Sequence, residues 1–376
     1  MTRLVWRRWA GRQPTGIDRV CLAYLERFAP EAQAVVHHPR FRRILDRDSS
    51  AELFALLREP QRRFRQRLVS RALLRLGGAA CPSRNRPYLN IGHTGLDQEG
   101  FRAWVRTSTV RPIYFVHDLI PLTNPEFCRP GESKRHALRM KTVLSTASGV
   151  IGNSQSTLDS LARFADAEHL PCPPSIAAWL GTSKGRRGCH GHSPANRPTF
   201  VVLGTIEARK NHLLLLRIWR RLAHRMGDST PKLLIIGQRG WEADEVFDVL
   251  DRSDAIDGHV VELNGCTDDE LVRHFESARA LLFPSKVEGY GLPLVEALSA
   301  GLPVIASDLP VFREIGQGVP MLLDPDDELA WEAAILDFAQ PKSRDRDEQL
   351  RRLAEFRAPT WEDHFRAVES WLSTVV

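Results

Sequence analysis

The sequence predicts an α/β protein of two domains, each organised around a parallel β-sheet. Its length of 376 residues suits two domains of ordinary size. Short apolar runs alternate with helical patterns through the second half, and repeated strand–helix units require a parallel sheet with covered faces. Between the halves, residues 181–197 are rich in Gly, Ser, Arg and Pro, which is typical of a linker.

These observations give the expected boundaries. Residues 1–180 form a first domain, 181–197 a linker and 198–357 a second domain. In the first domain we expect the first strand to be short or missing, because residues 1–9 supply only one short apolar patch. Residues 358–376 are predicted to be a closing helix, with apolar side chains at helical spacing at Trp361, Phe365, Val368 and Trp371.

Composition narrows the class of protein. With 43% apolar and 26% charged residues, the chain resembles water-soluble globular proteins. No apolar run approaches the length of a membrane-spanning helix, and no signal-peptide core follows the basic start. The six cysteines are scattered, which indicates reduced thiols in the cytoplasm. Cys189-His190-Gly191-His192 lies in the linker without a second ligand pair, so we expect no metal site.

Positive charge is concentrated at the start of the chain. Residues 1–80 hold 17 arginines and no lysine against 7 acidic residues. Residues 61–76 combine an apolar stripe with many of these arginines, which predicts a basic amphipathic helix. Such a helix either contacts an anionic membrane surface peripherally or packs on its own domain as an ordinary surface helix. No recognised nucleic-acid motif accompanies the arginines.

The most informative stretch runs from residue 283 to residue 310. A buried-strand pattern ends at Phe283, a turn with two glycines follows, and Pro293 suits the first turn of a helix over 294–300. A glycine turn entering a helix is a ready anion site, because free N–H groups point at the ligand. Glu288 precedes the turn and Glu296 lies in the first helical turn, where carboxylates suit hydroxyl groups. The ligand should carry both phosphates and hydroxyl-rich rings.

This stretch resembles the E-x7-E signature of retaining glycosyltransferases of the GT-B fold, family 4. The resemblance implies two Rossmann-like domains with parallel sheets facing a cleft. It implies that Glu288 contacts the hydroxyls of the donor sugar and Glu296 those of the ribose. It also implies that backbone N–H groups hold the sugar and diphosphate, at Gly289, Tyr290, Gly291 and Leu292. The alternative is an ordinary strand–loop–helix unit of an α/β domain.

Two further motifs lie at the expected distances. After the predicted strand 200–203 comes G-T-I-E-A-R-K-N, similar to the G-x-x-E-x-R-K-N element of that family. Two adjacent cations after a strand suit a diphosphate, so Arg209 and Lys210 are the predicted phosphate clamp, with Thr205 at the donor site. Asn211 is expected to cap the next helix. In P-T-G-I-D, the resemblance implies that Gly16 approaches the donor phosphate.

The first domain carries one more candidate. His117 and Asp118 follow the predicted strand 113–116, and ligands of open α/β sheets bind at carboxyl ends of strands. The run H-D-L-I-P-L is recurrent in the family, which implies that His117 lies beside the donor sugar. A capped loop is the alternative interpretation.

Together these features predict a glycosyltransferase that moves a hexosyl group, with a lean towards mannose from GDP-mannose, and the resemblance implies that it retains configuration. The acceptor would be a saccharide, expected to be lipid-linked, in lipopolysaccharide, capsule or exopolysaccharide assembly at the inner membrane face. No D-x-D motif stands in a suitable position, so no cofactor or metal is expected. The alternatives are an epimerase-like enzyme of the same fold and an inactive protein that binds nucleotide sugars.

Overall fold

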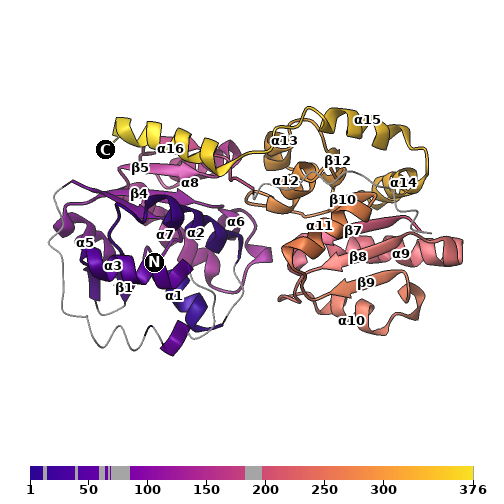
Figure 1. The fold of residues 1–376 in the computed structure, drawn as a ribbon, viewed down its shortest axis with the longest axis horizontal. Helices are drawn as coiled ribbons and strands as arrows, with labels where there is room; N and C mark the ends of the chain where they lie inside the picture. Colours follow the sequence, from indigo (N-terminus) through magenta and orange to yellow (C-terminus); the bar gives the residue numbers. More distant parts are fainter. Residues whose placement is uncertain are drawn as a thin grey trace. The chain divides into compact units, whose positions relative to one another are not determined.

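A computed structural model describes residues 1–11, 15–38, 41–58, 64–66, 68, 85–182 and 197–375. The chain divides into two compact units (Figure 1). The first unit consists of Met1–Ala178 together with Phe365–Val376, and the second of Trp179–His364. Most of the predicted basic helix 61–76, and most of the linker 181–197, lie outside the described residues. None of the described helices is long and apolar enough to cross a bilayer.

The first unit is organised around a four-stranded parallel sheet in the order β3-β4-β5-β6. Residues 113–116 of its strand β4 are fully buried, including Tyr114 and Phe115. A separate antiparallel hairpin, β1-β2, precedes the sheet. The strands are β1 Val35–His38, β2 Phe41–Ile44, β3 Pro87–Asn90, β4 Arg111–Val116, β5 Gly149–Gly152 and β6 Ser175–Ala177.

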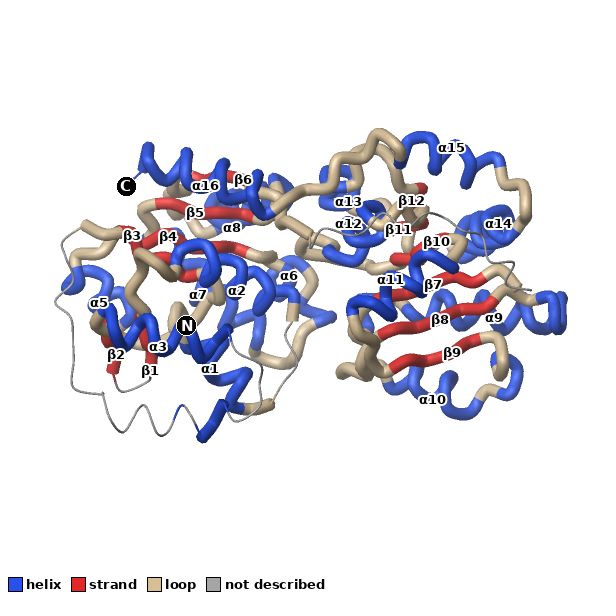
Figure 2. Tube along the Cα trace, in the orientation of Figure 1, coloured by secondary structure: helices blue, strands red, loops and turns tan. Residues whose placement is uncertain are grey.

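The first unit begins with a helix and not with a strand. Residues Thr2–Trp9 form α1, whose Leu4 is buried and whose Arg7 pairs with Asp18 of the next helix. The other helices of this unit surround the sheet (Figure 2). They are α2 Gly16–Phe28, α3 Arg47–Arg58, α5 Phe101–Ser108, α6 Ile120–Thr123, α7 Glu132–Thr146 and α8 Gln155–Ala167, with a 3₁₀ turn at Pro125–Phe127.

The second unit holds a six-stranded sheet, parallel throughout, in the order β12-β11-β10-β7-β8-β9. Counted along this unit, the order is 6-5-4-1-2-3, the arrangement of doubly wound dinucleotide-binding folds. The order reverses between β7 and β10, where such folds bind ligands. The strands are β7 Thr199–Leu203, β8 Lys232–Ile236, β9 Val260–Leu263, β10 Ala280–Phe283, β11 Val304–Ser307 and β12 Met321–Leu323.

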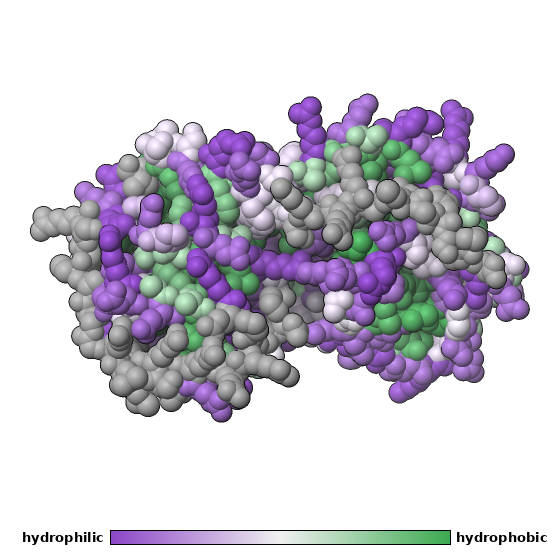
Figure 3. Space-filling model, viewed as in Figure 1, coloured by the Kyte–Doolittle hydropathy of each residue, from purple (hydrophilic) through white to green (hydrophobic). Residues whose placement is uncertain are grey.

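Helices cover this sheet and complete its core, in which Trp219 and Trp331 are fully buried. The helix α15 is highly charged, and its solvent side is the hydrophilic surface at the upper right of Figure 3. Its inner side also carries a polar side chain. The amide of Gln349 accepts a hydrogen bond from the Val304 N–H and donates one to the Val304 carbonyl. The helices are α9 His212–Met226, α10 Asp244–Arg252, α11 Asp268–Ser277, α12 Leu292–Ser299, α13 Pro310–Ile315, α14 Glu328–Ala339 and α15 Arg344–Leu353.

The unit boundaries differ slightly from the expected domain limits. Trp179 groups with the second unit, where its indole N–H donates to Glu314 at 2.8 Å. The last helix, α16 Trp361–Val375, begins in the second unit, and from Phe365 onward its residues belong to the first. There Phe365 packs edge-on against Tyr24, with 5.1 Å between ring centroids.

Candidate active site

The predicted phosphate clamp and the predicted sugar-binding carboxylate meet at the point where the strand order reverses. β7 and β10 are parallel neighbours, so the segments that follow them leave the same edge of the sheet. Arg209 and Lys210 lie on the 3₁₀ turn Ala208–Lys210 after β7, and Glu288 lies on the loop after β10. The two segments are tied by the backbone, since the Lys286 N–H donates to the Arg209 carbonyl at 2.8 Å.

Glu288 is the centre of an ion-pair cluster. Its Oε1 lies 2.5 Å from Lys210 Nζ, and its Oε2 lies 2.9 Å from Arg209 Nη1. The other arm of the Arg209 guanidinium contacts Glu207 at 2.6 Å. The side chains of Glu288 and Lys210 are only 7% and 10% exposed, so the pair is largely removed from water. Two cations and two carboxylates make the cluster neutral before any ligand is considered.

The cluster keeps Glu288 ionised. Burial alone would raise the pKa of this carboxyl, but the charges of Arg209 and Lys210 outweigh burial and lower the pKa to about 2. Burial lowers the pKa of Lys210, and the neighbouring Glu288 opposes that shift. The Lys210 ammonium also lies 4.9 Å from the centre of the Phe283 ring, a cation–π distance.

Close backbone approaches shape the two turns. A Cβ on Gly237, at the end of β8, would lie 1.9 Å from the Gly204 carbonyl oxygen at the end of β7. Gly291 has a φ of 110°, and a Cβ there would lie 2.6 Å from the ring of Phe312, which stacks on Phe283. Both turns therefore require glycine. Gly291 is followed directly by α12, whose second residue is Pro293.

The remaining predicted donor residues of this unit lie around the same turns. Tyr290 is buried and its hydroxyl donates to the Leu180 carbonyl at 3.2 Å, so its side chain is structural. Leu292 begins α12, two residues earlier than expected. Glu296 is the fifth residue of that helix, one position beyond its first turn, and is half-buried. Thr205 is exposed beside Gly204.

One predicted cap is wrong. Asn211 occupies the position before α9, but its side chain makes no cap hydrogen bond. Its backbone is left-handed, with a φ of 56°, and its amide instead donates to the Pro325 carbonyl at 2.9 Å. A left-handed residue turns its side chain away from the first helical N–H groups, which sequence identity alone did not reveal.

In the first unit, His117 lies buried at the carboxyl end of β4. Its Nε2–H donates to the Ile91 carbonyl at 2.6 Å, because a carbonyl can only accept. Its own carbonyl accepts a hydrogen bond from the Asn153 amide at 2.7 Å. Burial lowers the pKa of His117 to about 4, so the ring is neutral at neutral pH. The neutral ring has Nδ1 as its hydrogen-bond acceptor.

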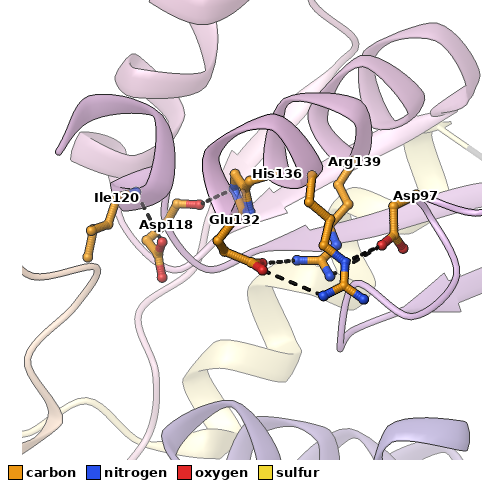
Figure 4. Close-up of polar contacts among 7 residues, drawn as sticks. Asp97, Asp118, Ile120, Glu132, His136 and Arg139 are labelled. Carbon is orange, nitrogen blue, oxygen red and sulfur yellow. Dashed lines mark hydrogen bonds and ion pairs between the residues drawn. The ribbon is translucent and has the colours of Figure 1, made fainter. Parts of the chain in front are cut away.

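The loop after His117 is fixed by the helix α7 (Figure 4). The His136 Nε2–H donates to the Asp118 carbonyl at 3.2 Å, and the Asp118 carboxylate accepts the Ile120 N–H at 3.1 Å. On the next turn of α7, Arg139 pairs with Glu132 at 2.8 Å and with Asp97 at 3.5 Å. These contacts make the histidine–aspartate segment a rigid part of the unit.

Gly16 lies at the exposed first turn of α2. This helix end already holds a carboxylate, because Asp18 accepts hydrogen bonds from the N–H and hydroxyl of Thr15 at 2.7 Å each. Asp18 also pairs with Arg3 at 2.8 Å and with Arg7 at 2.6 Å. The spacing T-x-x-D is the signal that could have revealed this capping box in the sequence.

The sequence reasoning missed the residues that hold the candidates in place. His136 and Asn153 bond backbone carbonyls on the His117–Asp118 segment from elements far along the chain. Nothing in their local sequence marks these partners. Among the residues that the structure describes, no group of three metal-ligating side chains is assembled.

Comparisons with known proteins agree with this fold. Residues 197–340 match the family described as "Glycosyl transferases group 1". The chain is 30% identical over 219 residues to the serotype-specific mannosyltransferase WbdA of Escherichia coli, a match covering 54% of this chain and 27% of that protein. It is 33% identical over 163 residues to the O-antigen chain mannosyltransferase B of the same species, covering 43% and 42% respectively. The chain thus spans less than half the length of these relatives.

Solved structures show the fold. Sucrose-phosphate synthase from Thermosynechococcus elongatus superimposes with a TM-score of 0.59 at 16% identity, covering 96% of this chain and 94% of that one. Anabaena Alr3699/HepE in complex with UDP gives 0.57 at 15% identity, covering 82% of each chain. The resemblance stated from the motifs is confirmed: the chain has the GT-B fold, is similar to mannosyltransferases, and carries in residues 197–340 a glycosyl transferases group 1 domain.

Proposed function

We propose that this protein is a glycosyltransferase that moves a mannosyl group from GDP-mannose to a saccharide hydroxyl with retention of configuration. The observation that carries the proposal is the contact of Glu288 with both Arg209 and Lys210, at the reversal of strand order. A carboxylate beside two cations suits a ligand that has hydroxyls next to a diphosphate. Relatives named as mannosyltransferases support the choice of sugar.

In the proposed reaction the bond between the anomeric carbon and the diphosphate breaks, and the acceptor oxygen bonds that carbon from the same face. The acceptor hydroxyl passes its proton to the oxygen of the leaving diphosphate. Negative charge grows on the leaving diphosphate, and Arg209 and Lys210 would stabilise it where it develops. Because Glu207 and Glu288 already balance these cations, the bound diphosphate would draw Arg209 and Lys210 partly away from them. Glu288 would then accept hydrogen bonds from the sugar, and Glu296 from the ribose.

The other assigned residues take supporting roles in this proposal. Backbone N–H groups from Gly289 to Leu292 would hold the sugar and diphosphate, with Thr205 beside them. Gly16 would approach the donor phosphate, and neutral His117 would accept a hydroxyl hydrogen bond from the sugar through Nδ1. The proposed chemistry requires no metal or cofactor.

The acceptor is proposed to be a lipid-linked saccharide of surface-polysaccharide assembly on the cytoplasmic membrane face. Two relatives that are named O-antigen chain mannosyltransferases support this choice. Contact with anionic lipid would come from residues 61–76. That contact predicts co-sedimentation with anionic vesicles that falls as salt rises, and its loss when Arg63, Arg67 and Arg71 become glutamate. Binding that ignores salt would contradict it.

A direct assay tests the proposed function. The protein is incubated with GDP-mannose and methyl α-mannoside, and the product is examined by NMR for the configuration of the new linkage. An α-linked product supports the proposal, whereas a β-linked product contradicts retention. A panel of nucleotides in a thermal-shift experiment identifies the donor, because a ligand that binds only the folded protein raises its melting temperature. Sugar conversion without acceptor would indicate an epimerase, and binding without turnover an inactive protein.

A further inference from the structure

A basic pocket of about 600 Å³ lies on the outer face of α9, outside the candidate active site. Five residues of that helix line it together with Ala255, which lies on the 3₁₀ turn Asp254–Ile256. All five carry basic side chains, and they are Arg217, Arg220, Arg221, His224 and Arg225. The volume lies within the range of about 300–1,000 Å³ that small-molecule sites occupy. None of these residues takes part in the proposed reaction.

The sequence of α9 places these side chains on one face of the helix. Counted from Arg217, the others follow at positions +3, +4, +7 and +8, which share one face of an α-helix. The opposite face holds the buried side chains of Leu215, Ile218, Trp219 and Leu222. The ion-pair partners of the basic face come from α14 and α10, between which α9 lies (Figure 1). The helix therefore presents a continuous row of cations between its two neighbours.

One wall of the basic pocket is held in place by α14. Arg221 and Arg225 both contact the buried carboxylate of Glu332, at 2.6 Å and 2.7 Å, and Arg221 also contacts Glu328. The Arg225 side chain nevertheless remains 51% exposed. This wall is thus fixed before a ligand arrives, so little side-chain freedom is lost on binding.

The other wall carries cations with little or no compensation. The Arg217 guanidinium lies 3.7 Å from Glu245 of α10, and both side chains are exposed, so this pair contributes little. Among the residues that the structure describes, the side chains of Arg220 and His224 form no ion pair or hydrogen bond. Asp254 is exposed and forms no ion pair with these arginines. Four arginines against three paired carboxylates leave one positive charge in surplus.

We propose that the basic pocket binds a ligand that presents two or more phosphate groups, at a site distinct from the predicted phosphate clamp. Guanidinium groups donate paired N–H bonds to phosphate oxygens, and an imidazole N–H donates one more. Successive turns of the helix are about 5.4 Å apart, so neighbouring phosphates meet cations of different turns. Free oligophosphates and anionic lipid headgroups share this chemistry. The inference stands on the pocket alone and does not depend on the proposed glycosyl transfer.

Calorimetric titration with tripolyphosphate measures binding to the full chain. Arg220→Gln removes an unpaired cation from the pocket, and Ala255→Glu places a carboxylate in it. Arg252→Gln is the matched control, because it removes the same charge from the exposed side of α10. Arg209→Ala reports on the predicted clamp. Both substituted pocket positions are exposed, so these variants should fold, and an unchanged melting temperature checks this.

We expect Arg220→Gln and Ala255→Glu to weaken binding of tripolyphosphate at least about tenfold. Arg252→Gln should change it by less than about twofold, and Arg209→Ala should leave the binding in place. Loss in Arg209→Ala with none in Arg220→Gln would assign the anion to the clamp and overturn the proposal. Equal losses in Arg220→Gln and Arg252→Gln would also overturn it, because they would reflect net charge alone.

Vesicles distinguish the two sources of phosphate. The same variants are sedimented with vesicles of phosphatidylglycerol in phosphatidylcholine, and with phosphatidylcholine alone. Binding to the anionic vesicles that depends on Arg220, without binding of tripolyphosphate, would identify lipid headgroups, and the reverse would identify a free oligophosphate. Binding to neither probe would overturn the proposal. Turnover of GDP-mannose is scored separately, so failure of the proposed function leaves this test unaffected.

Discussion

The two units fix their candidate residues in opposite ways. In the second unit, Lys210 and Glu288 are charged groups that balance one another in a largely buried pair. In the first unit, His117 and His136 are neutral rings, each held by a hydrogen bond to a backbone carbonyl. Charges that compensate each other remain able to exchange partners when an ionic ligand arrives. Neutral groups bonded to the backbone have no such alternative, so the first unit offers a rigid surface and the second a responsive one.

The largest expected effect comes from breaking the charge balance of the second unit. Lys210→Met leaves the buried Glu288 with one partner fewer, and breaking a buried pair costs about 3–5 kcal/mol. Chemical denaturation of the variant should show this loss in the second unit, and turnover should fall at least tenfold. Arg209→Ala should lower turnover similarly.

A matched control separates stability from catalysis. Lys141→Met removes a partly exposed pair with Glu168 and should change stability by less than about 1 kcal/mol. The double variant Lys210→Met with Glu288→Gln removes both charges, so it should recover much of the stability but none of the turnover. Recovery of turnover in the double variant would show that the pair is structural only.

Acidification should affect the two units unequally. In the first unit, burial lowers the pKa of His37 and of His117 to about 4. Burial also lowers the pKa of His93 and that of His136. The unfolded chain protonates histidines below about pH 6.5, whereas the folded unit keeps His37 and His117 neutral down to about pH 4. It also holds His93 and His136 neutral to a lower pH than the unfolded chain does. Stability therefore falls as the pH falls through this window, by about 2 kcal/mol for His117 alone between pH 6.5 and pH 5.

The second unit gives the contrast in the same experiment. The pKa of Glu288 is about 2, below its ordinary value, so its stabilising charge is lost only below about pH 4.5. Burial lowers the pKa of His212 to about 3, and the pKa of His259 is also lowered. Among the residues that the structure describes, this unit therefore has fewer such histidines than the first. Hydrogen exchange, corrected for its intrinsic pH dependence, should show β4 and β5 weakened more than β7 and β8 at pH 5. Equal weakening would contradict the comparison.

The two carboxylates of the candidate site, Glu288 and Glu296, should affect the binding of different ligands. Glu296→Gln should weaken binding of GDP by about tenfold, because its proposed partner is the ribose. Glu288→Gln should leave GDP binding nearly unchanged and impair transfer, because its proposed partner is the sugar. Calorimetry with GDP and steady-state kinetics measure the two properties. Equal losses of GDP affinity would reverse or merge the assigned roles.

The smallest expected effect on turnover concerns the loop after β4. His136→Leu removes the donor to the Asp118 carbonyl and should cost about 1–3 kcal/mol of stability. If His136 positions His117, kcat should fall severalfold while KM for the nucleotide sugar stays constant. His136→Gln keeps an N–H near the same place and should restore kcat. Loss of stability without any change in kcat would leave His136 a structural residue.

The sequence allowed the second unit to be predicted better than the first. The strands of its sheet were expected from short apolar runs, and the motif around Glu288 marks the turn that the structure builds there. Its site arises from segments directly after strands, so local patterns contain most of the information. The ion pairing of Glu288 with Lys210 was not predicted, because 78 residues separate them and only the sheet order brings them together.

In the first unit the decisive contacts are nonlocal. His117 was identified from its place after a strand, but its partners Ile91 and Asn153 lie 26 and 36 residues away. The helix at Thr2–Trp9 reflects the pairing of Arg3 and Arg7 with Asp18, which no local pattern announces.

The contact between Gly204 and Gly237 has a consequence for how this protein can diverge. With 1.9 Å between the Gly204 carbonyl oxygen and any Cβ at position 237, even alanine there requires the turn after β7 to move. That turn leads to Arg209 and Lys210. A side chain at position 237 would therefore shift these two cations without touching them. Descendants of this sequence can acquire a residue there only together with a remodelled first turn. Position 237 and the turn at Gly204 should therefore vary together. A combinatorial library that randomises position 237 alone should return glycine.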